Sequence, residues 1–214
     1  MGRRKKQPCY IHRENIATSA HQLFMSKGIE QTSMNDIAKA AGYSKATLYV
    51  YFQNKEEIIA LLVLESMKKL DEYITSALEK EKKAKARYEM ICQSLVHYQE
   101  QFPFYFEMVL DEININWQKS HCVAEEQETF RVGESINEKL GQFIQEGIQN
   151  GELRKDIQII STIMAFWGML SGLIQLGVKK ELYIKQELHL SKQSFLQYGF
   201  DTLYRSITME GKNE

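Results

Sequence analysis

A short helix predicted near the N-terminus carries an outer face whose groups can contact DNA bases. One cation, one hydroxyl, one phenol and two small apolar groups point away from the inward anchors Leu48 and Phe52. A helix of this kind fits the major groove, where Ala and Thr contact a thymine methyl and Lys reaches guanine acceptors. We therefore predict a base-reading surface on this helix. Its outward residues are Lys45, Ala46, Thr47, Tyr49 and Val50.

Hydroxyl, phenol and ammonium groups also flank this helix, at positions that suit contacts with DNA phosphates. Ser33 and Ser44 are predicted helix caps, and the amides and dipole of a helix N-terminus attract anions. Tyr43 and Tyr49 offer phenolic donors. Lys55 begins the next helix, where its charge opposes the helix dipole, so a bound phosphate explains it better than intramolecular stability does. The alternative is that the tyrosines pack and that Lys55 is merely solvated.

Short helices must hold these groups in place. The spacing of apolar residues predicts a first helix from about Arg13 to Lys27, which stops at Gly28 in a left-handed conformation. Ser33 and Asp36 have the form of a capping box and start a second helix. Gly42 ends this helix after barely two turns and accepts the turn conformation that follows.

The third helix begins immediately after this turn. Ser44 is its predicted cap, and it runs from Lys45 to about Tyr51. The small Ala38 and Ala41 allow it to cross the second helix closely, which describes a helix-turn-helix. Asn54 then caps a fourth helix that continues to roughly residue 80 and connects this unit to the rest of the chain.

The remainder of the chain is also helical in pattern. Only 2 Pro and 12 Gly occur, and no stretch shows sustained alternation of polar and apolar residues, so we predict an all-α fold. Further helices are expected near residues 86–101, 104–119, 123–150, 156–178 and 191–207.

The net charge of −1 hides an uneven distribution. Residues 1–60 hold 9 basic and 5 acidic side chains, and subtraction from the totals of 27 and 28 leaves 18 basic and 23 acidic ones in residues 61–214. A basic N-terminal segment before an acidic remainder favours a polyanion as one partner, although a charge run can also be mere solvation. The 3 cysteines form no CxxC pair, and no apolar core follows Arg3–Lys6, so we expect a reducing, cytoplasmic location without a secretory signal.

Aromatic and acidic side chains gather between residues 98 and 117. Residues 100–138 hold 9 acids against 2 bases, and aromatic rings with carboxylates can hold a lipophilic cation. We predict a small-molecule site here, for a lipophilic or cationic ligand. Core packing with solvated acids is the alternative, and Met164 and Trp167 are expected to pack rather than to bind. The candidate ligand residues are Phe102, Tyr105, Phe106, Met108, Asp111 and Trp117.

Residues 159–178 form an uncharged stretch of 20 residues, which is long enough to span a bilayer. Polar residues interrupt it and no basic cluster marks one flank, so we expect a core or subunit-interface helix and no membrane span. Gly168 and Gly172 would allow a second helix to approach closely. Together with an apolar stripe on the last helix, this stretch would form a homodimer interface. The stripe consists of Leu196, Phe200, Leu203 and Ile207.

The stretch from Thr32 to Ile58 resembles the DNA-binding signature of TetR-family transcriptional regulators. The resemblance is dense over residues 12–60, and beyond them it is confined to length, helix content and the pattern Gly147-x-x-x-Gly151-Glu152-x-x-x-Asp156. The matching pieces are Thr32-Ser33, Asp36-Ile37-Ala38, Ala41-Gly42-Tyr43-Ser44, Thr47-Leu48-Tyr49, Tyr51-Phe52 and Lys55-Glu56.

The resemblance implies a homodimeric, ligand-responsive repressor. Residues 1–55 would form a DNA-binding domain with a basic N-terminal tail, and residues 56–214 a helical domain that binds an effector and dimerises through its last two helices. The dimer would bind a pseudo-palindromic operator in double-stranded DNA and leave it when the small molecule binds.

Individual residues can be carried over from the resemblance. Lys45 and Ala46 match positions that face bases. The sequence departs from the family at Tyr51, where many relatives have His. Arg3–Lys6 resembles N-terminal arms that reach neighbouring phosphates or the minor groove, and a disordered tail is the alternative. The positions that match phosphate contacts are Ser33, Tyr43, Ser44, Thr47, Tyr49 and Lys55.

Enzymatic function has little support in the sequence. The motifs GxGxxG, GxxxxGK[ST], GxSxG and HExxH are absent, and the 5 histidines are scattered, so we predict no catalytic residue, no metal site and no cofactor. The alternative to a DNA-binding regulator is a helical small-molecule-binding or scaffold protein without DNA binding.

Overall fold

The computed structural model describes residues 8–111 and 123–209. This part of the chain contains ten α-helices and no strand, so the all-α prediction is confirmed. The helices are α1 (Cys9–Lys27), α2 (Met34–Ala41), α3 (Lys45–Tyr51), α4 (Lys55–Glu79), α5 (Ala84–Gln101), α6 (Pro103–Asp111), α7 (Ala124–Gln149), α8 (Ile159–Lys179), α9 (Glu181–Glu187) and α10 (Lys192–Arg205).

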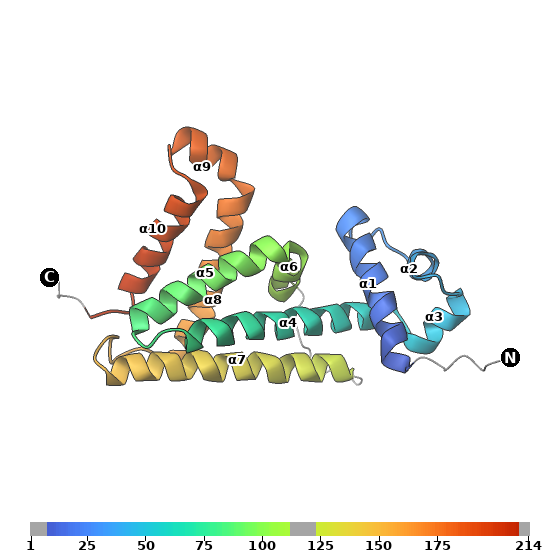
Figure 1. Cartoon of the computed structure of the whole chain (residues 1–214), viewed down its shortest axis with the longest axis horizontal. Helices are drawn as coiled ribbons and strands as arrows, with labels where there is room; N and C mark the ends of the chain where they lie inside the picture. Colours follow the sequence, from blue (N-terminus) through green and yellow to red (C-terminus); the bar gives the residue numbers. More distant parts are fainter. Residues whose placement is uncertain (1–7, 112–122, 210–214) are drawn as a thin grey trace.

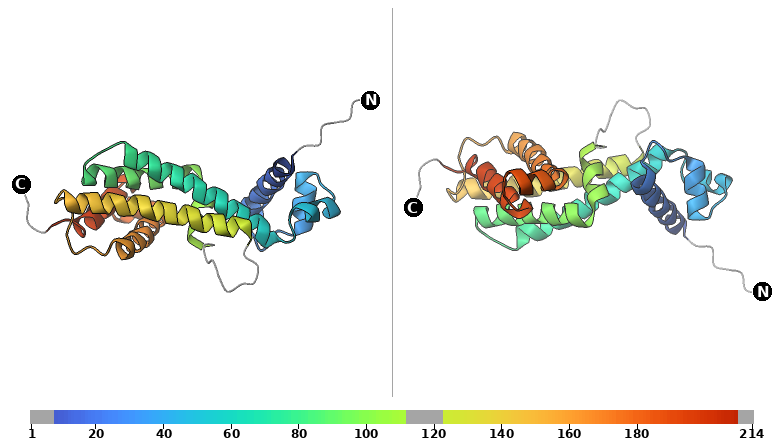
Figure 2. Two further views of the ribbon diagram at one scale, coloured as in Figure 1. Left: turned by 90° about the horizontal axis from the view of Figure 1, so that it is seen from below. Right: turned by 90° about the horizontal axis from the view of Figure 1, so that it is seen from above.

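The helices form an elongated molecule with two different ends (Figure 1). α1, α2 and α3 lie together at one end, and the long α4 runs from them into the rest of the molecule. Figure 2 shows from two sides that α4 and α7 lie next to each other, which agrees with their extensive contacts. α8 and α10 pack together, with α9 between them in the chain, and project to one side of the α4–α7 pair.

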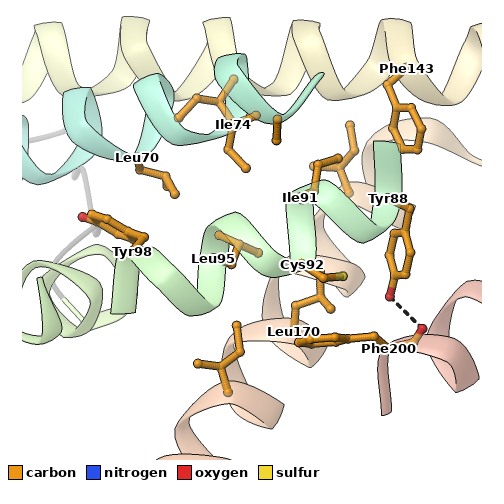
Figure 3. Close-up of a cluster of buried hydrophobic side chains, with 14 of the residues drawn as sticks. Leu70, Ile74, Tyr88, Ile91, Cys92, Leu95, Tyr98, Phe143, Leu170 and Phe200 are labelled. Atoms are coloured by element: carbon orange, nitrogen blue, oxygen red, sulfur yellow. Dashed lines mark hydrogen bonds between the residues drawn. The ribbon is translucent and has the colours of Figure 1, made fainter. Parts of the chain in front are cut away.

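Two hydrophobic clusters form the core. The smaller cluster joins the inner faces of α1, α2 and α3 to the first turns of α4, and α6 adds Met108. The larger cluster joins α4, α5, α7, α8 and α10. Figure 3 shows part of it, with Leu70 and Ile74 of α4 near Ile91 and Leu95 of α5. Because α4 contributes side chains to both clusters, it physically connects the two ends.

Side-chain caps start α2, α3 and α4 where the sequence predicts them. The Oγ of Ser33 accepts a hydrogen bond from the backbone N–H of Asp36 at 3.2 Å, and the Asp36 carboxylate accepts one from the Ser33 N–H at 3.0 Å. Ser44 caps α3 and Asn54 caps α4 in the same way. Gly42 has φ 74° and ψ 24°, the left-handed conformation that turns the chain from α2 into α3. The helix-turn-helix is therefore fixed by local contacts.

α1 differs from its prediction at both ends. It begins at Cys9, about one turn earlier than expected. It stops at Gly28 as predicted, and φ is positive at 86°, as glycine permits, but ψ 156° lies outside the left-handed helical region. The N–H of Gly28 still bonds to the carbonyl oxygen of Phe24, so the chain leaves α1 directly toward α2.

A tight corner between α7 and α8 accounts for the glycine and glutamate in residues 147–156. Leu153 is fully buried, and a Cβ at position 147 would lie 2.6 Å from its Cδ1, so Gly147 is needed there. The Glu152 carboxylate accepts a hydrogen bond from the N–H of Ala84 at 2.8 Å. This contact caps α5 and holds the corner against it.

The later helices agree with the expected segments except in two places. The helix expected over residues 104–119 begins at Pro103 and is described to Asp111, and its remainder lies outside the described residues. α9 was not predicted. Its seven residues bury only Ile184, so they show no periodic stripe that a sequence pattern would reveal.

The apolar stripe of α10 faces the interior of its own chain, and not outward as the predicted dimer interface requires. Its apolar stripe packs into the larger cluster of its own chain, against α5 and α8. The stripe is thus unavailable to a second copy, and this part of the prediction is wrong because the chain itself covers it. The residues concerned are Leu196, Phe200, Leu203 and Ile207.

α8 leaves one apolar face uncovered. It is long and apolar enough to cross a membrane by length and composition alone, but it packs against α7 and α10. A Cβ at Gly168 or Gly172 would meet no atom within 4 Å, so both glycines lie on the open side. The exposed side chains of α8 include Ile160, Met164, Met169, Leu176 and Val178.

Candidate DNA-binding surface and ligand cavity

α3 presents the predicted base-reading face to solvent, at the end of the molecule formed by α1 to α3 (Figure 1). Leu48 and Phe52 are fully buried in the smaller cluster, as predicted. On the opposite face Val50 is 74% exposed and Tyr49 is 38% exposed. One helix therefore brings the predicted outward residues together. Lys45 and Ala46 are also exposed, and Thr47 is half-buried.

The serine caps at the edges of this surface use their hydroxyl groups internally. Ser44 Oγ lies 2.8 Å from Thr47 Oγ1, and Ser33 Oγ donates to the Asp36 carboxylate at 2.6 Å. The Lys27 ammonium donates to the same carboxylate at 2.9 Å. Hydrogen bonds from Ser33 and then Lys27 hold the pKa of Asp36 well below its ordinary value. The capping box is therefore charged and firmly held, and a phosphate contact by Ser33 requires its proton to be redirected.

Lys55 has an intramolecular partner that the sequence argument missed. Its Nζ donates to the carbonyl oxygen of Ile29 at 2.8 Å, and its side chain is half-buried. Ile29 lies in the loop between α1 and α2, so the ammonium ties the start of α4 to that loop. Lys55 thus contributes to intramolecular stability, contrary to the prediction. An ammonium has three donors, so two remain for a phosphate, and the role in DNA binding stays a prediction.

Tyr43 is half-buried and bonded to α1. Its phenol oxygen lies 2.7 Å from Nδ1 of His12. The His12 ring stacks on Tyr51 with centroids 5.1 Å apart, and Tyr43 meets Tyr51 edge to face. Tyr51, where the sequence departs from the TetR pattern, therefore packs in an aromatic seam between α1 and α3. Tyr43 both packs in this seam and keeps a polar tip.

Arg13 connects α3 to α7. Its guanidinium donates to the carbonyl oxygen of Tyr51 at 2.6 Å and to the Glu125 carboxylate, and it lies 4.2 Å from the centroid of the Phe52 ring. Glu125 stands in the first turn of α7. One turn later, the hydroxyl of Thr129 donates to the Glu125 carbonyl oxygen at 2.8 Å. A chain of polar contacts thus runs from α3 through α1 into α7.

α6 makes a further contact between the two ends. Met108 is buried among side chains of α1 to α4, and His21 of α1 stacks on Phe104 and Tyr105 at centroid distances of 4.7 and 5.1 Å. The phenol of Tyr105 donates to the Glu65 carboxylate of α4 at 3.0 Å. Burial lowers the pKa of His21 and raises the pKa of Glu65. The neutral forms of both side chains are therefore favoured at this contact.

A cavity of about 420 Å³ lies within the larger cluster, between α4, α5, α7 and α8. This volume is in the range of small-molecule sites. Its wall is mainly apolar, and in the described part of the chain no Lys, Arg or His lines it. Phe130, Glu134 and Met164 are lining residues that also reach the surface, so the cavity opens between α7 and α8. The cavity suits a lipophilic molecule. Its wall includes Leu70, Ile91, Leu95, Thr129, Asn137, Phe143, Thr162 and Leu170.

None of the predicted ligand residues whose side chains the structure describes lines this cavity. The rings of Phe102 and Phe106 pack at a tilt against Tyr98 of α5, while Tyr105 and Met108 make the α6 contacts described above. The reason is that α6 turns its aromatic face toward α1, α4 and α5, away from the opening between α7 and α8. Of the other two candidates, Asp111 is the last residue of α6, and Trp117 lies outside the described residues.

Two residues expected only to pack do line the cavity. They are Met164 and Trp167 of α8. A signal for the cavity was present on α7, where Thr129, Gly133 and Asn137 recur every four residues along an otherwise apolar stripe. Small and polar side chains in such a stripe do not fill a core. Which helices face that stripe is a property of the fold, and the sequence pattern does not contain it.

Comparison with known proteins relates the N-terminal helices to regulators of transcription. A family model described as bacterial regulatory proteins of the tetR family matches residues 16–62, which run from within α1 into α4. The Fatty acid metabolism regulator protein of Bacillus subtilis is 24% identical over 163 residues, which are 73% of this chain and 76% of that protein. Several other curated regulators align over between 28% and 44% of their own length.

Solved structures extend the similarity over nearly the whole chain. The TetR-family transcriptional regulator PfmR from Thermus thermophilus matches with a TM-score of 0.65 and 25% identity, covering 89% of this chain and 97% of PfmR. The structure of AibR in complex with isovaleryl coenzyme A and operator DNA matches with a TM-score of 0.66 and 18% identity, covering 90% and 98%. The fold of the described residues is thus shared with these solved structures.

Proposed function

Because the chain belongs to the TetR family of DNA-binding transcriptional regulators, we propose that it is a cytoplasmic repressor whose homodimer leaves its operator when a lipophilic small molecule fills the ligand cavity. The observation that carries this proposal is the pairing of an exposed recognition helix at one end with an apolar cavity at the other. α4, the contact between Arg13 and Glu125, and the contacts of α6 join these ends. A ligand in the cavity can therefore affect the position of α3 through them.

The DNA-binding role falls on α2, α3 and the start of α4, within a domain of residues 1–55. Lys45 and Ala46 face bases in this proposal, because both are exposed on the outer face of α3. The groups around them hold the phosphates on either side of the groove. These groups are Ser33, Tyr43, Ser44, Thr47, Tyr49 and Lys55.

The dimer forms through α8 and α10, within a domain of residues 56–214. The open apolar face of α8 supports this arrangement, because Gly168 and Gly172 lie on it and admit a helix from a second copy. Tyr198 of α10 is 70% exposed and adds an aromatic side chain from α10. A twofold dimer reads a pseudo-palindrome with half-sites about 34 Å apart, or a multiple of that.

The proposed effector carries an acyl chain. The apolar wall supports an alkyl group inside the cavity, and the names of two similar proteins refer to fatty acid metabolism and to isovaleryl coenzyme A. No basic side chain lines the described cavity, so an anionic head group would project through the mouth into solvent. Glu134 at that mouth favours a lipophilic cation instead, and the two ligand classes can be separated by experiment.

Release requires the effector to bind better to a DNA-incompetent arrangement. α4 is the main lever, since it lines the cavity with Met67, Leu70 and Ile74 and also enters the smaller cluster. A shift of α4 changes the distance between the two recognition helices of the dimer. They then no longer match the half-site spacing.

The test begins with selection of operator fragments by the purified protein. We expect an inverted repeat to be protected in footprinting, with an affinity that falls by about 10³ to 10⁵ between 50 and 200 mM salt if six to ten phosphates are contacted. Absence of any preference over random competitor DNA would contradict the proposal and favour a helical binding or scaffold protein without DNA binding.

The effector class is tested on the selected operator. Saturated fatty acids, their coenzyme A thioesters and a lipophilic quaternary ammonium compound are added separately, and release of DNA is measured. We expect release by the acyl compounds, with an affinity that rises with chain length until the cavity is full. Release by the cation alone would overturn the acyl assignment and leave the DNA-binding role intact.

A further inference from the structure

His12 occupies an unusual place beside the recognition helix. It lies on α1, but its Nδ1 is 2.7 Å from the phenol oxygen of Tyr43, which is one of the proposed phosphate contacts. Its ring stacks on Tyr51 at the end of α3. Both rings of the seam hold the imidazole in position, and the side chain is only half-buried. A titratable group is thus built into the edge of the DNA-binding surface.

The protons shared by His12 and Tyr43 limit what the phenol can do. A phenol carries one proton, and a neutral imidazole has one donor and one acceptor nitrogen. If Nδ1 of His12 is the acceptor, the only proton of Tyr43 points at the ring and none remains for a phosphate. If Nδ1 carries the proton, the phenol is free to donate outward, but the other ring nitrogen is then a bare lone pair.

Protonation removes this conflict. The imidazolium donates from Nδ1 to the phenol oxygen of Tyr43, so the phenol proton is released for a phosphate. The second N–H of His12 becomes a donor as well, and the ring gains a positive charge. The imidazolium form is therefore the one in which both side chains act as donors and the site is cationic.

The charged and titratable groups near His12 come from α1, from the turn after α2 and from α3. Tyr43 from the turn after α2 and Tyr51 from α3 are the titratable groups that face it. On α1, Arg13 turns its guanidinium to Glu125 of α7, to the Tyr51 carbonyl and to the Phe52 ring. In the described contacts no carboxylate is paired with His12, so a DNA phosphate would be its anionic partner.

We propose that His12 is a proton-linked positioning residue for DNA binding: the complex with DNA takes up a proton on His12, which turns the Tyr43 hydroxyl toward a phosphate. This inference rests on the proposed function. The DNA-bound state holds more protons than the free state, so affinity rises as pH falls through the range in which imidazoles titrate. Because the contact is with phosphate, the effect does not depend on base sequence.

The test measures binding to a random-sequence duplex at low, constant ionic strength, between about pH 8 and about pH 6. The wild type should bind more tightly on acidification, by at most about tenfold per pH unit for each protomer, which corresponds to one proton. His12→Gln keeps a hydrogen-bonding partner for Tyr43 but cannot titrate, so it should match the wild type near pH 8 and gain less below it.

Two further variants complete the test. His97→Gln, which changes an exposed histidine of α5, is the matched control and should follow the wild type at every pH. Tyr43→Phe removes the phenol that His12 is proposed to turn, so its loss of affinity relative to the wild type should be larger near pH 6 than near pH 8. A thermal melt of each variant at both pH values shows that it is folded.

Several results would overturn the inference. They are an undiminished pH dependence in His12→Gln, full affinity of Tyr43→Phe at the lower pH, or no pH dependence in the wild type. Absence of duplex binding at every pH would overturn the proposed function itself and this inference with it. Specific operator binding without the proton linkage would overturn the inference alone.

Discussion

The two ends of the molecule differ in where their polar side chains lie. At the α1–α3 end, hydroxyl and ammonium groups stay near the surface and are held by hydrogen bonds to neighbouring caps and carbonyls. Around the cavity, four helices bring mainly apolar side chains together, and Glu134 is left at the mouth. The function of the first end therefore depends on the direction of a few polar side chains, whereas that of the second depends on the volume its side chains leave empty.

The largest effect on stability and DNA binding should come from removing one large side chain from the smaller cluster. Phe52→Ala removes a fully buried ring from the smaller cluster and should cost about 3–5 kcal/mol of stability. We expect DNA binding to be lost while the larger cluster still unfolds cooperatively. In a Trp117→Phe background, the fluorescence of Trp167 reports on the cavity wall and checks this.

The matched variant for the other end is Phe143→Ala. Phe143 is buried in the larger cluster and lines the cavity. The change should therefore lower the stability of the unfolding transition that Trp167 fluorescence reports, and it should leave the folding of α1 to α3 intact. If both variants instead lower every transition equally, the two clusters behave as one cooperative unit through α4, and the contrast between the ends is structural but not energetic.

The next effect comes from filling the cavity without touching the reading surface. Gly133 lies on α7 in the cavity wall, and a Cβ there would meet only the end of the Met67 side chain, at 3.6 Å. Gly133→Leu should therefore extend into the cavity and weaken binding of an acyl ligand by about 1–3 kcal/mol, the usual cost of overpacking. Titration calorimetry with a saturated fatty acid measures this.

Operator affinity in the absence of ligand provides the contrast. It should be unchanged in Gly133→Leu, because the reading surface is at the other end. Gln145→Leu adds the same side chain to an exposed position of α7 and should alter neither property. Unchanged ligand binding by Gly133→Leu would show that the ligand occupies some other part of the molecule.

The same contrast explains how much the sequence could predict. The caps at Ser33, Ser44 and Asn54, the turn at Gly42 and the bounds of α3 follow from residues three or four positions apart, and all are found where expected. Contacts over longer separations were missed even in this region. Ile29 is 26 residues from Lys55, and no local pattern pairs an ammonium with a carbonyl so far away.

The cavity lies away from the described residues that the sequence suggested for ligand binding, for a similar reason. An aromatic helix face packs equally well against a ligand or against another helix, and the order in which helices pack decides between them. α6 faces α1, α4 and α5, so its rings are core, while Trp167 of α8 lines the cavity. The homodimer stripe failed likewise, because Phe200 of α10 faces its own α5, where its carbonyl accepts a hydrogen bond from Tyr88 (Figure 3).

Substitution of two lysines should distinguish base recognition from phosphate binding. Lys45→Ala removes an exposed cation from the outer face of α3 and should change the preference among operators by about 1–3 kcal/mol. Lys55→Ala should weaken binding to all sequences alike and reduce the salt slope by about one unit. Competition between operator variants over a salt series measures both effects.

The Lys55 contact with Ile29 adds a control to this pair. Loss of that hydrogen bond should also lower stability by about 1 kcal/mol, which Lys45→Ala should not do. Equal behaviour of the two variants in competition would remove the division between base reading and phosphate holding. A loss of stability without any change in salt slope would make Lys55 purely structural.

The smallest effect tests the contact that joins the two ends. His21 of α1 stacks on Phe104 and Tyr105, and burial lowers its pKa, so the unfolded chain binds its proton more readily than the folded one does. Stability should therefore be fully present above about pH 6.5, the ordinary value for histidine, and decline as pH falls below it. Glu65, whose pKa is raised by burial, contributes a pH dependence of the opposite sign, which the wild type and a His21 variant share.

His21→Phe keeps the ring stacking at this contact and removes the titration. Its melting temperature should fall less on acidification than that of the wild type, and a difference of 1 kcal/mol corresponds to about 2–4 °C in a chain of this size. His97→Phe, at an exposed position, should keep the wild-type dependence. A parallel decline of wild type and His21→Phe would mean that the acid-sensitive element lies elsewhere and that stacking alone holds α1 against α6. A smaller decline would identify the contact between the two ends as the part of the molecule that acid loosens first.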